Sequence, residues 1–210
     1  MMPLDQLENR STKSYEYWDN RYIIGADSGP GSYNQLAEFK AYVLNKFVET
    51  HEVQRVLEFG CGDGNQLLFA NYGSYFGLDV SKTAIQICKT KFATDASKSF
   101  CHYNIDEASR LSNFLSADLV LSLDVLYHLV EDEIFESYID NLFKTSTRFV
   151  IIYSSNFEDP EYTPEQFKHV RHRKIADYIE NNIKDFEFIG EIKNVYPQLT
   201  TANFYIYQKI

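Results

Sequence analysis

The chain has 210 residues, 44% of them hydrophobic and 16% aromatic, and it carries a formal net charge of −10 at pH 7. This length supports one hydrophobic core but is short for two ordinary domains, so we expect a single domain over residues 1–210. The acidic charge disfavours nucleic-acid backbones and anionic membranes as partners. The N-terminus is polar, and no apolar run is long enough to span a membrane. The three cysteines lack the spacing of a disulfide or zinc framework, and the five histidines lack ligand spacing with carboxylates. We therefore expect a cytoplasmic protein with reduced thiols and no metal.

Residues 1–52 form the first segment in chain order and precede the predicted core. Within it, residues 15–33 are denser in aromatic residues and glycine than a solvated leader would be. Residues 25–33 are a loop rich in glycine, serine and proline, which is flexible by composition. An amphipathic helix is predicted over residues 33–51, because apolar side chains recur there at helical spacing: Leu36, Phe39, Val43 and Phe47.

Residues 53–210 alternate between strand and helix patterns and form the predicted core. The predicted strands are residues 54–60, 75–80, 98–105, 117–125, 148–155, 186–194 and 201–209. The predicted helices are residues 65–72, 81–92, 131–143 and 175–183, with Ser81 as the N-cap candidate of the second. Apolar strands that alternate with helices indicate a parallel sheet between two helical layers.

We therefore predict an α/β three-layer sandwich with a mostly parallel, seven-stranded sheet and helices on both faces. The last two strands have no helix between them, so they should pair antiparallel at one edge, with the last strand antiparallel to the rest of the sheet. In an open sheet of this kind, ligands bind beyond the carboxyl ends of the strands. The site should then lie just after Phe59, Leu78, Asn104, Leu123 and Tyr153.

A glycine-rich stretch, EFGCGDGN, follows the first core strand and opens the next element. A dinucleotide fingerprint would need a third glycine at position 65, where the chain has Asn65, so a nicotinamide oxidoreductase is disfavoured. The stretch instead has the pattern E-x-G-x-G-x-G, built from Glu58, Gly60, Gly62 and Gly64, and Asp79 ends the following strand. With the stretches NID and LDVLYHL at later strand ends, this spacing resembles motifs I and II of class I S-adenosylmethionine-dependent methyltransferases.

The resemblance implies a Rossmann-like fold and S-adenosylmethionine as cofactor. A glycine turn lets the main chain lie against the cofactor where a Cβ would collide, and Asp79 can accept hydrogen bonds from both ribose hydroxyls. In such a family Asp106 binds the adenine amino group and Ile105 covers the ring. The alternative is that Asp79 and Asp106 are merely polar residues that end strands. The expected cofactor residues are Glu58, Gly60, Cys61, Gly62, Gly64, Asp79, Val80, Asn104, Ile105, Asp106, Leu123, Trp18 and Arg21.

The end of the fourth core strand should border the methyl acceptor, and Asp124 and His128 are the obvious titratable groups there. Methyl transfer rests largely on holding the acceptor in line with the methyl group and sulfur, and a hydroxyl acceptor also benefits from a base such as neutral histidine. We therefore predict His128 and Asp124 as catalytic residues. The alternative for His128 is that it only supports the following helix.

In enzymes that this chain resembles, the region before motif I folds over the cofactor as a lid. The candidates to exclude water there are the rings of Tyr17, Trp18 and Tyr22, and the guanidinium of Arg21 could hold a carboxylate or phosphate. The alternative is that these aromatic rings simply pack on the sheet.

A basic run, residues 168–174, follows the fifth core strand. It should therefore lie on the side of the site at which the acceptor binds. Arginine side chains suit phosphate and carboxylate, so an anionic acceptor is one prediction. The alternative is a solvated face that balances the acidic segments around it. The expected substrate-binding residues are Tyr22, Tyr127, Tyr153, Arg171, His172 and Arg173.

The sequence therefore predicts a methyltransferase that acts on an oxygen or nitrogen atom of a small molecule. A phosphorylated or nucleotide-activated sugar, or another surface-polysaccharide precursor, is the expected acceptor. The alternative is a non-catalytic subunit that binds S-adenosylmethionine and docks a protein partner through the basic run. The oligomeric state stays open.

Overall fold

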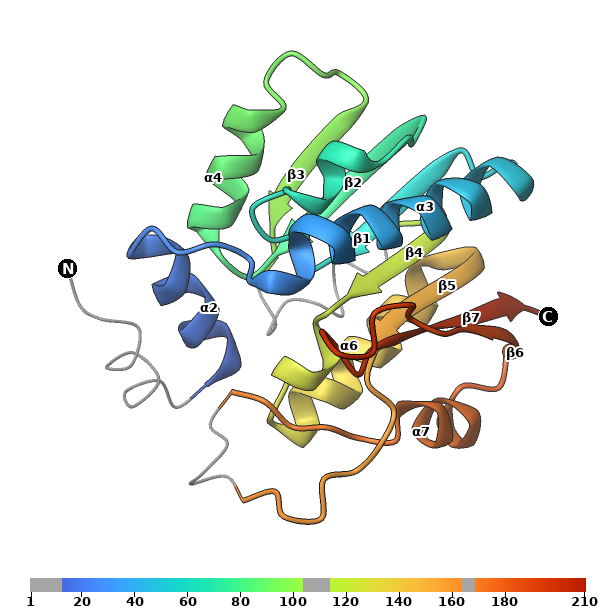
Figure 1. Cartoon of the computed structure of the whole chain (residues 1–210). Helices are drawn as coiled ribbons and strands as arrows, with labels where there is room; N and C mark the ends of the chain where they lie inside the picture. The colour runs from blue at the N-terminus through green and yellow to red at the C-terminus, as the bar shows by residue number, and fades with distance from the viewer. Residues whose placement is uncertain (1–12, 104–113, 164–168) are drawn as a thin grey trace.

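The computed structural model describes residues 13–103, 114–163 and 169–210 (Figure 1). Its centre is a seven-stranded sheet with the strand order β3-β2-β1-β4-β5-β7-β6. Strands β1 to β5 pair in parallel, whereas β7 pairs antiparallel with both β5 and β6. The predicted α/β sheet with an antiparallel last strand is thereby confirmed. The strands are β1 Arg55–Phe59, β2 Ser74–Asp79, β3 Lys98–His102, β4 Ala117–Leu123, β5 Ser146–Ser154, β6 Phe186–Ile192 and β7 Asn203–Lys209.

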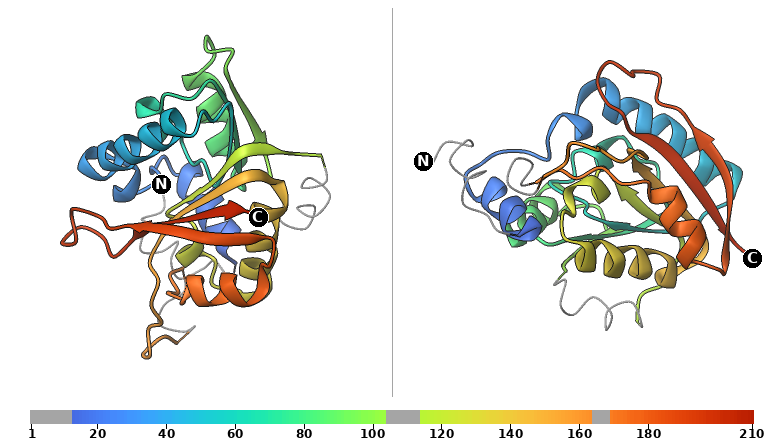
Figure 2. Two further views of the ribbon diagram at one scale, coloured as in Figure 1. Left: turned by 90° about the vertical axis from the view of Figure 1, so that its right-hand side faces the viewer. Right: turned by 90° about the horizontal axis from the view of Figure 1, so that it is seen from below.

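Helices cover both faces of the sheet, as the three-layer prediction requires (Figure 2). Residues of α3 and α4 pack on one face, and residues of α6 and α7 pack on the other. The helices are α2 Ser14–Ile23, α3 Asn34–Thr50, α4 Lys82–Lys91, α6 Asp132–Thr145 and α7 Ile175–Asn182, with single 3-10 turns η1 Pro30–Ser32, η2 Gln66–Phe69 and η4 Leu126–His128.

Strand β5 shows why the strands read as continuous apolar runs. Ile151 belongs to the core cluster on the α3 side, and Val150 and Ile152 belong to the cluster on the α6 side. All three side chains have 0% exposure. Each such burial stabilises the fold by about 1.5–3 kcal/mol, so a parallel strand in this position must be apolar on both faces.

The start of α4 follows the predicted capping. The Ser81 hydroxyl accepts a hydrogen bond from the backbone N–H of Ala84 at 3.1 Å, which satisfies one of the free donors of the first helical turn. The predicted N-cap is confirmed, and it fixes the direction in which the chain leaves β2 at the edge of the site.

Two predicted elements differ from the structure. The helix predicted over residues 65–72 is wrong, because the structure has only the turn η2 there. The side chain of Asn45 donates to Phe69 O at 2.9 Å and accepts from Asn71 N at 2.8 Å, so backbone groups that a longer helix would use are engaged elsewhere. The N-terminal aromatic segment, for which no helix was predicted, forms α2.

The carboxyl ends of the parallel strands face α2 (Figure 1). We call residues 13–33 the lid segment and residues 60–65 the glycine loop. Among the residues that the structure describes, no helix combines the length and the apolar character needed to cross a membrane.

Candidate active site

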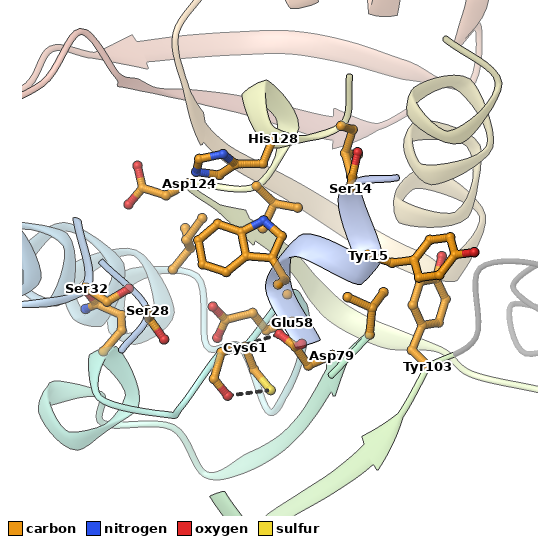
Figure 3. A pocket seen from close by; sticks show the side chains of 18 of the residues that line it. Ser14, Tyr15, Ser28, Ser32, Glu58, Cys61, Asp79, Tyr103, Asp124 and His128 are labelled. Atoms are coloured by element: carbon orange, nitrogen blue, oxygen red, sulfur yellow. Dashed lines mark hydrogen bonds between the residues drawn. The ribbon is translucent and has the colours of Figure 1, made fainter. Parts of the chain in front are cut away.

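A pocket with about 830 Å³ of empty space, part of it open to solvent, lies between the lid segment and the carboxyl ends of β1, β2 and β4. This is the edge of the sheet at which a ligand was expected. Figure 3 shows Glu58, Cys61 and Asp79 on one side of it and Asp124 and His128 on the opposite side. The predicted residues that line it are Trp18, Tyr22, Glu58, Gly60, Cys61, Gly62, Asp79, Val80, Leu123, Asp124 and His128. Lining residues that were not predicted are Ser14, Tyr15, Ser28, Ser32, Lys40, Gln66, Tyr103, Val125, Leu129 and Tyr138.

The glycine loop allows close approach from two directions. A Cβ at Gly60 would lie 2.4 Å from a methyl carbon of Val125, and a Cβ at Gly62 would lie 2.3 Å from Oγ of Ser28. Both glycines also have positive φ angles, 80° and 57°, which disfavour other residues. The loop therefore has no room for side chains at Gly60 and Gly62, because the lid segment and the chain after β4 contact it there.

Asp79 lies at the end of β2 with its carboxylate at the pocket. One oxygen accepts from Gly62 N and the other from Ser81 N, each at 2.8 Å. A carboxylate has about four acceptor positions, so both oxygens keep capacity for a ligand with two hydroxyl groups. Burial raises the pKa of Asp79 to about 6, and the two backbone hydrogen bonds oppose that rise.

Glu58, on β1, is the second buried carboxyl group of the pocket. It accepts a hydrogen bond from the Tyr75 hydroxyl at 2.7 Å. Burial raises its pKa to about 7, against the effects of the Tyr75 hydrogen bond and the positive charge of Lys40. Glu58 is therefore close to half-protonated near neutral pH.

The lid segment is fastened to the glycine loop through Asp63. Ser28 N donates to Asp63 at 3.1 Å, Asp63 N donates to Ser28 Oγ at 2.9 Å, and the Tyr33 hydroxyl donates to the same carboxylate at 2.7 Å. Asn65 adds a hydrogen bond to Ser32 O at 2.7 Å. The loop predicted to be flexible by composition is thus tied down over the pocket.

Helix α2 is fastened at two further points. The Ser81 hydroxyl donates to Asp19 at 2.7 Å, and Ser14 N donates to the Glu131 carboxylate at 3.0 Å. These contacts join the lid segment to the N-termini of α4 and α6. Helix α2 is therefore held beside the pocket at Ser14 and Asp19.

Trp18 and Tyr22 carry the aromatic part of the lid. The Trp18 ring meets the His128 ring edge-on at 4.8 Å between centroids. The Tyr22 hydroxyl shares a hydrogen bond with Ser28 at 2.8 Å. Arg21 lies outside the pocket lining and binds Asp27 instead, through the main-chain oxygen at 2.6 Å and the carboxylate at 3.2 Å.

His128 lines the pocket, and among the described residues none is hydrogen-bonded to its Nε2. Its Nδ1 lies 2.9 Å from the main-chain oxygen of His169. A carbonyl oxygen only accepts, so Nδ1 must carry the proton and Nε2 keeps its lone pair in the neutral ring. Burial lowers the pKa of His128 to about 4, although the His169 hydrogen bond opposes that shift. The ring is therefore neutral near pH 7, with the lone pair of Nε2 unprotonated.

Asp124 is held by two neighbours at the mouth of the same pocket. Lys40 Nζ lies 2.5 Å from Oδ2, and the Tyr127 hydroxyl donates to Oδ1 at 2.8 Å. Asp124 also has a positive φ of 60°. This carboxylate is already paired with a cation, which makes His128 the better placed base.

Lys40 and Gln66 are pocket residues that the sequence analysis missed. Lys40 stands in the apolar stripe of α3 between Leu36 and Val43 and is fully buried. A lysine in such a stripe was the available signal, because a buried lysine needs a partner. Gln66 was obscured by the helix predicted over its segment.

The expected substrate residues after β5 lie elsewhere. Tyr153 has 0% exposure, is a core residue on the α3 face, and contacts Asn194 through its hydroxyl. The His172 ring shares a hydrogen bond with the Ser155 hydroxyl at 2.7 Å. Neither of them, nor Tyr127, belongs to the pocket lining, and Gly64 lies outside it too. Tyr127 nevertheless reaches the pocket wall through its hydrogen bond to Asp124 at 2.8 Å, and its ring lies 5.9 Å from that of His172 between centroids.

The arginines of the basic run bind groups at the start of α6. Arg173 donates to the main-chain oxygens of Leu129 and Val130 at 2.6 and 2.9 Å and to Asp132 at 3.0 Å. Arg171 pairs with Asp132 at 2.8 Å. This arrangement matches the alternative in which the cations balance an acidic helix.

Three of the expected cofactor residues, Asn104, Ile105 and Asp106, lie outside the described residues, as does residue 168 of the basic run. Within the described ranges, no cluster of three or more histidine, cysteine, aspartate or glutamate side chains could hold a metal ion.

The comparisons with known proteins agree with this site. A family model described as a methyltransferase domain matches residues 50–202, and no curated protein gives a significant match. Among solved structures, the N-methyltransferase NodS from Bradyrhizobium japonicum WM9, in complex with S-adenosyl-L-homocysteine, has a TM-score of 0.71 at 16% identity and aligns over 94% of this chain and 98% of its own. Magnesium protoporphyrin IX methyltransferase from Synechocystis PCC 6803, also with S-adenosylhomocysteine bound, has a TM-score of 0.64 at 15% identity and aligns over 93% of this chain and 98% of its own.

An O-methyltransferase family protein from Burkholderia thailandensis has a TM-score of 0.65 at 13% identity, over 98% of this chain and 62% of its own. At these identities the likeness shows the shared fold, and the family match over most of the chain shows the membership. The chain therefore belongs to the methyltransferase-domain family and is a class I S-adenosylmethionine-dependent methyltransferase.

Proposed function

We propose that this enzyme transfers the methyl group of S-adenosylmethionine to an oxygen or nitrogen atom of a small molecule, with His128 as the base. The observation that carries the proposal is the position of His128. Its proton-free Nε2 belongs to the same pocket as Asp79 and the glycine loop. One pocket therefore has groups suited to the cofactor on one side and a base for the acceptor on the opposite side.

The residues present fit the cofactor. Gly60 and Gly62 line the pocket without side chains, so the main chain can contact a ligand there, and Asp79 keeps acceptor capacity for the two ribose hydroxyls. The cofactor supplies an activated methyl group on a sulfonium sulfur when it is bound. The lid segment, which is hydrogen-bonded across the glycine loop, would exclude water from that end of the pocket.

His128 would take the proton that a hydroxyl or amine acceptor loses as its new bond to the methyl carbon forms. Such assistance is worth about 10²–10⁴-fold in rate. The products are the methylated acceptor and S-adenosylhomocysteine, and His128 then returns the proton to solvent. Its low pKa keeps the ring neutral before each turnover. Asp124, paired with Lys40, would orient the acceptor side of the site without taking the proton.

The acceptor itself stays a prediction. An anionic acceptor such as a phosphorylated or nucleotide-activated sugar was predicted from Arg171 and Arg173, but both guanidinium groups bind Asp132 and main-chain oxygens. The net charge of −10 still disfavours nucleic acid as substrate. The related structures include an N-methyltransferase and an O-methyltransferase, which supports either atom as acceptor. A cytoplasmic location is supported by the free thiols of Cys61, Cys88 and Cys101.

The test is transfer of a labelled methyl group from S-adenosylmethionine to a panel of small hydroxyl and amine compounds, in neutral and phosphorylated pairs. We expect turnover with at least one pair, and a preference for the phosphorylated member if the acceptor is anionic. Cofactor binding by calorimetry without turnover on any compound, alone or with added cell extract, would favour the non-catalytic subunit instead.

A further inference from the structure

His128 belongs to a closed set of four residues in which each contacts the next. Its Nδ1 lies 2.9 Å from the main-chain oxygen of His169, and the His169 ring stacks on the Tyr17 ring with 4.6 Å between centroids and 9° between planes. Tyr17 meets Trp18 edge-on at 5.5 Å, and Trp18 meets His128 edge-on at 4.8 Å. We call these four residues the clamp. It joins three separate segments of the chain at the base: α2, η4 and the chain before α7.

The chain before α7 is fixed to the turn that carries the base. Figure 1 shows this part of the chain, coloured orange, beginning beside the start of α2. We call residues 169–173 the strap. Arg171 N donates to Tyr127 O at 2.7 Å, and the guanidinium group of Arg173 donates to Leu129 O at 2.6 Å. The strap therefore binds the main-chain oxygens on both sides of the base, which keeps its first carbonyl group beside the imidazole ring.

Tyr17 is the member of the clamp that comes from inside the lid helix. It is 6% exposed and is not among the described residues that line the pocket. Its ring contacts are with Trp18 and His169. Stacked and edge-on aromatic pairs have preferred geometries. Tyr17 therefore limits the movement of residue 169, and with it the movement of the carbonyl oxygen that binds the base.

The hydrogen bond from His128 to the strap decides which ring nitrogen is the base. A neutral imidazole has two tautomers, and the partner of one nitrogen sets which nitrogen carries the proton. The His169 oxygen only accepts, so it keeps the proton on Nδ1 and leaves the lone pair on Nε2. Without this oxygen the Nε2–H tautomer also becomes accessible. In that tautomer Nε2 cannot take a proton from an acceptor.

We propose that Tyr17 is a positioning residue for His128. By stacking on His169, it keeps the carbonyl oxygen of the strap on Nδ1 and so keeps Nε2 free of a proton. The inference rests on the base role proposed above and deepens it, because it makes the docked position of α2 a condition for the reactive tautomer. The lid then has a second function besides the exclusion of water.

Two other roles account for fewer of these contacts. If Tyr17 only anchored α2, the hydrogen bonds of Ser14 and Asp19 would already serve that purpose. If the strap only balanced the acidic start of α6, its arginines would suffice. Neither role requires a carbonyl oxygen at His128 Nδ1 or a ring stacked on the residue that provides it.

The first experiment measures the tautomer of His128 and needs no acceptor. Proton–nitrogen correlation spectra of protein with isotope-labelled histidine rings report the tautomer at neutral pH, and His128→Gln identifies the signals. We expect Nδ1–H to exceed Nε2–H by at least about tenfold in the unaltered protein, a bias that one hydrogen bond can supply. Tyr17→Leu should lower this ratio at least about fivefold, whereas Tyr17→Phe keeps the ring and should keep the ratio.

His169→Leu removes the same stack from the other side. The residue is only half-buried, so this variant decides the question if Tyr17→Leu fails to fold. It should lower the tautomer ratio in the same way. An unchanged ratio in either folded leucine variant would overturn the proposal, and the base role of His128 would still stand.

The second experiment measures methyl transfer to the compound of the panel above that turns over fastest. Tyr17→Leu should lower kcat at least about tenfold, because both the tautomer and the ring orientation are lost. The Michaelis constant for the acceptor and the affinity for S-adenosylhomocysteine should each change less than about threefold. Tyr17→Phe should restore kcat. Phe143→Leu, which removes a buried ring in the last turn of α6, is the control and should lower the melting temperature without lowering kcat.

The two readouts together separate the failures. Weaker S-adenosylhomocysteine binding by Tyr17→Leu with an unchanged tautomer would make Tyr17 an anchor of the lid and overturn the proposal. A changed tautomer with normal kcat would overturn the base role of His128, and the proposed control of catalysis by Tyr17 with it.

Discussion

Ser28 and Asp63 hold each other by two hydrogen bonds, one from each backbone N–H to the other side chain, at 3.1 and 2.9 Å. One residue belongs to the lid segment and the other to the glycine loop, which closes the lid over the bare backbone that the glycines provide. We expect this contact to slow the entry and exit of the cofactor.

Asp63→Ala should loosen the lid. The change removes acceptors for the backbone of Ser28 and the hydroxyl of Tyr33, at about 1–2 kcal/mol for a set of charge-assisted bonds. We expect faster dissociation of S-adenosylhomocysteine in stopped-flow experiments and faster proteolysis within residues 24–33. Asp140→Ala, on the exposed side of α6, is the control and should change neither rate.

The same contact should fail in acid. Burial raises the pKa of Asp63, but hydrogen bonds from Tyr33, Asn65 and Ser28 outweigh it and leave the pKa below its ordinary value. A lowered pKa means that the carboxylate stabilises the fold above the unfolded pKa and loses this effect as the pH falls through the folded pKa. Proteolysis of the lid that stayed constant down to that pH would contradict the role given to Asp63.

Asp79→Ala should weaken S-adenosylmethionine by about 2–3 kcal/mol, because charge-assisted bonds to both ribose hydroxyls are lost. The affinity of the unaltered protein should also fall as the pH drops below about 6, where Asp79 becomes protonated. Calorimetry over this pH range checks both statements. Asp79→Asn keeps an acceptor and should lose less. Unchanged affinity in a folded Asp79→Ala protein would remove Asp79 from the cofactor site.

His128→Ala should lower kcat while the affinity for S-adenosylmethionine stays nearly intact, because the base acts on the acceptor. The base form is the neutral ring, so the rate should hold from neutral pH down to about 5 and fall as the pH passes through about 4. In His128→Ala, the rate should no longer fall as the pH passes through about 4. Recovery of rate with added imidazole would support a base. Normal turnover with a lower melting temperature would return His128 to the supporting role.

Most of the fold follows from local patterns, because buried parallel strands must be apolar on both faces. The strand ends then located Glu58, Asp79 and His128 without any tertiary knowledge. The helix expected over residues 65–72 does not form, because the side chain of Asn45 on α3 binds the backbone oxygen of Phe69 and the backbone N–H of Asn71. Such a contact between distant segments leaves no trace in the periodicity of either segment.

Lys40 was missed and Arg173 was assigned to the wrong place for the same reason: tertiary contacts decide where a long side chain ends. Lys40 sits on a helix whose pattern is apolar, and only the tertiary packing of α3 against the pocket gives it Asp124 as a partner. Arg173 was expected at the acceptor because it follows β5, but position after a strand does not fix where a long side chain ends. Its guanidinium reaches free carbonyl oxygens before α6.

Glu58→Gln should stabilise the ligand-free protein at alkaline pH. Burial raises the pKa of Glu58 to about 7, so the folded state favours the protonated form. The associated stability is complete below the unfolded pKa, about 4.3, and is lost as the pH rises through 7. At pH 8 the variant should exceed the unaltered protein by about 3 kcal/mol, and the difference should vanish near pH 4. Chemical denaturation at both pH values checks this. A difference that does not depend on pH would contradict the assigned pKa.

Arg173→Ala separates the two interpretations of the basic run. The guanidinium group donates to two main-chain oxygens and pairs with Asp132 at the first turn of α6. Its removal leaves the Leu129 oxygen unpaired and the Val130 oxygen with Arg171 alone, and with the lost ion pair it costs about 2–3 kcal/mol. We expect the melting temperature to drop by about 4–12 °C and the Michaelis constant for the acceptor to stay unchanged.

Arg171→Ala should show a smaller loss of stability, because Arg171 is more exposed than Arg173. Lys174→Ala, an exposed residue of the same run, is the matched control and should change neither quantity. An anionic acceptor bound by these arginines would give another pattern. Its Michaelis constant would rise at least about tenfold in both arginine variants, about 1.4 kcal/mol, and the rise would shrink at high salt because screening weakens exposed charge interactions. That pattern would restore the arginines to the acceptor site, and with them the phosphorylated or nucleotide-activated substrate.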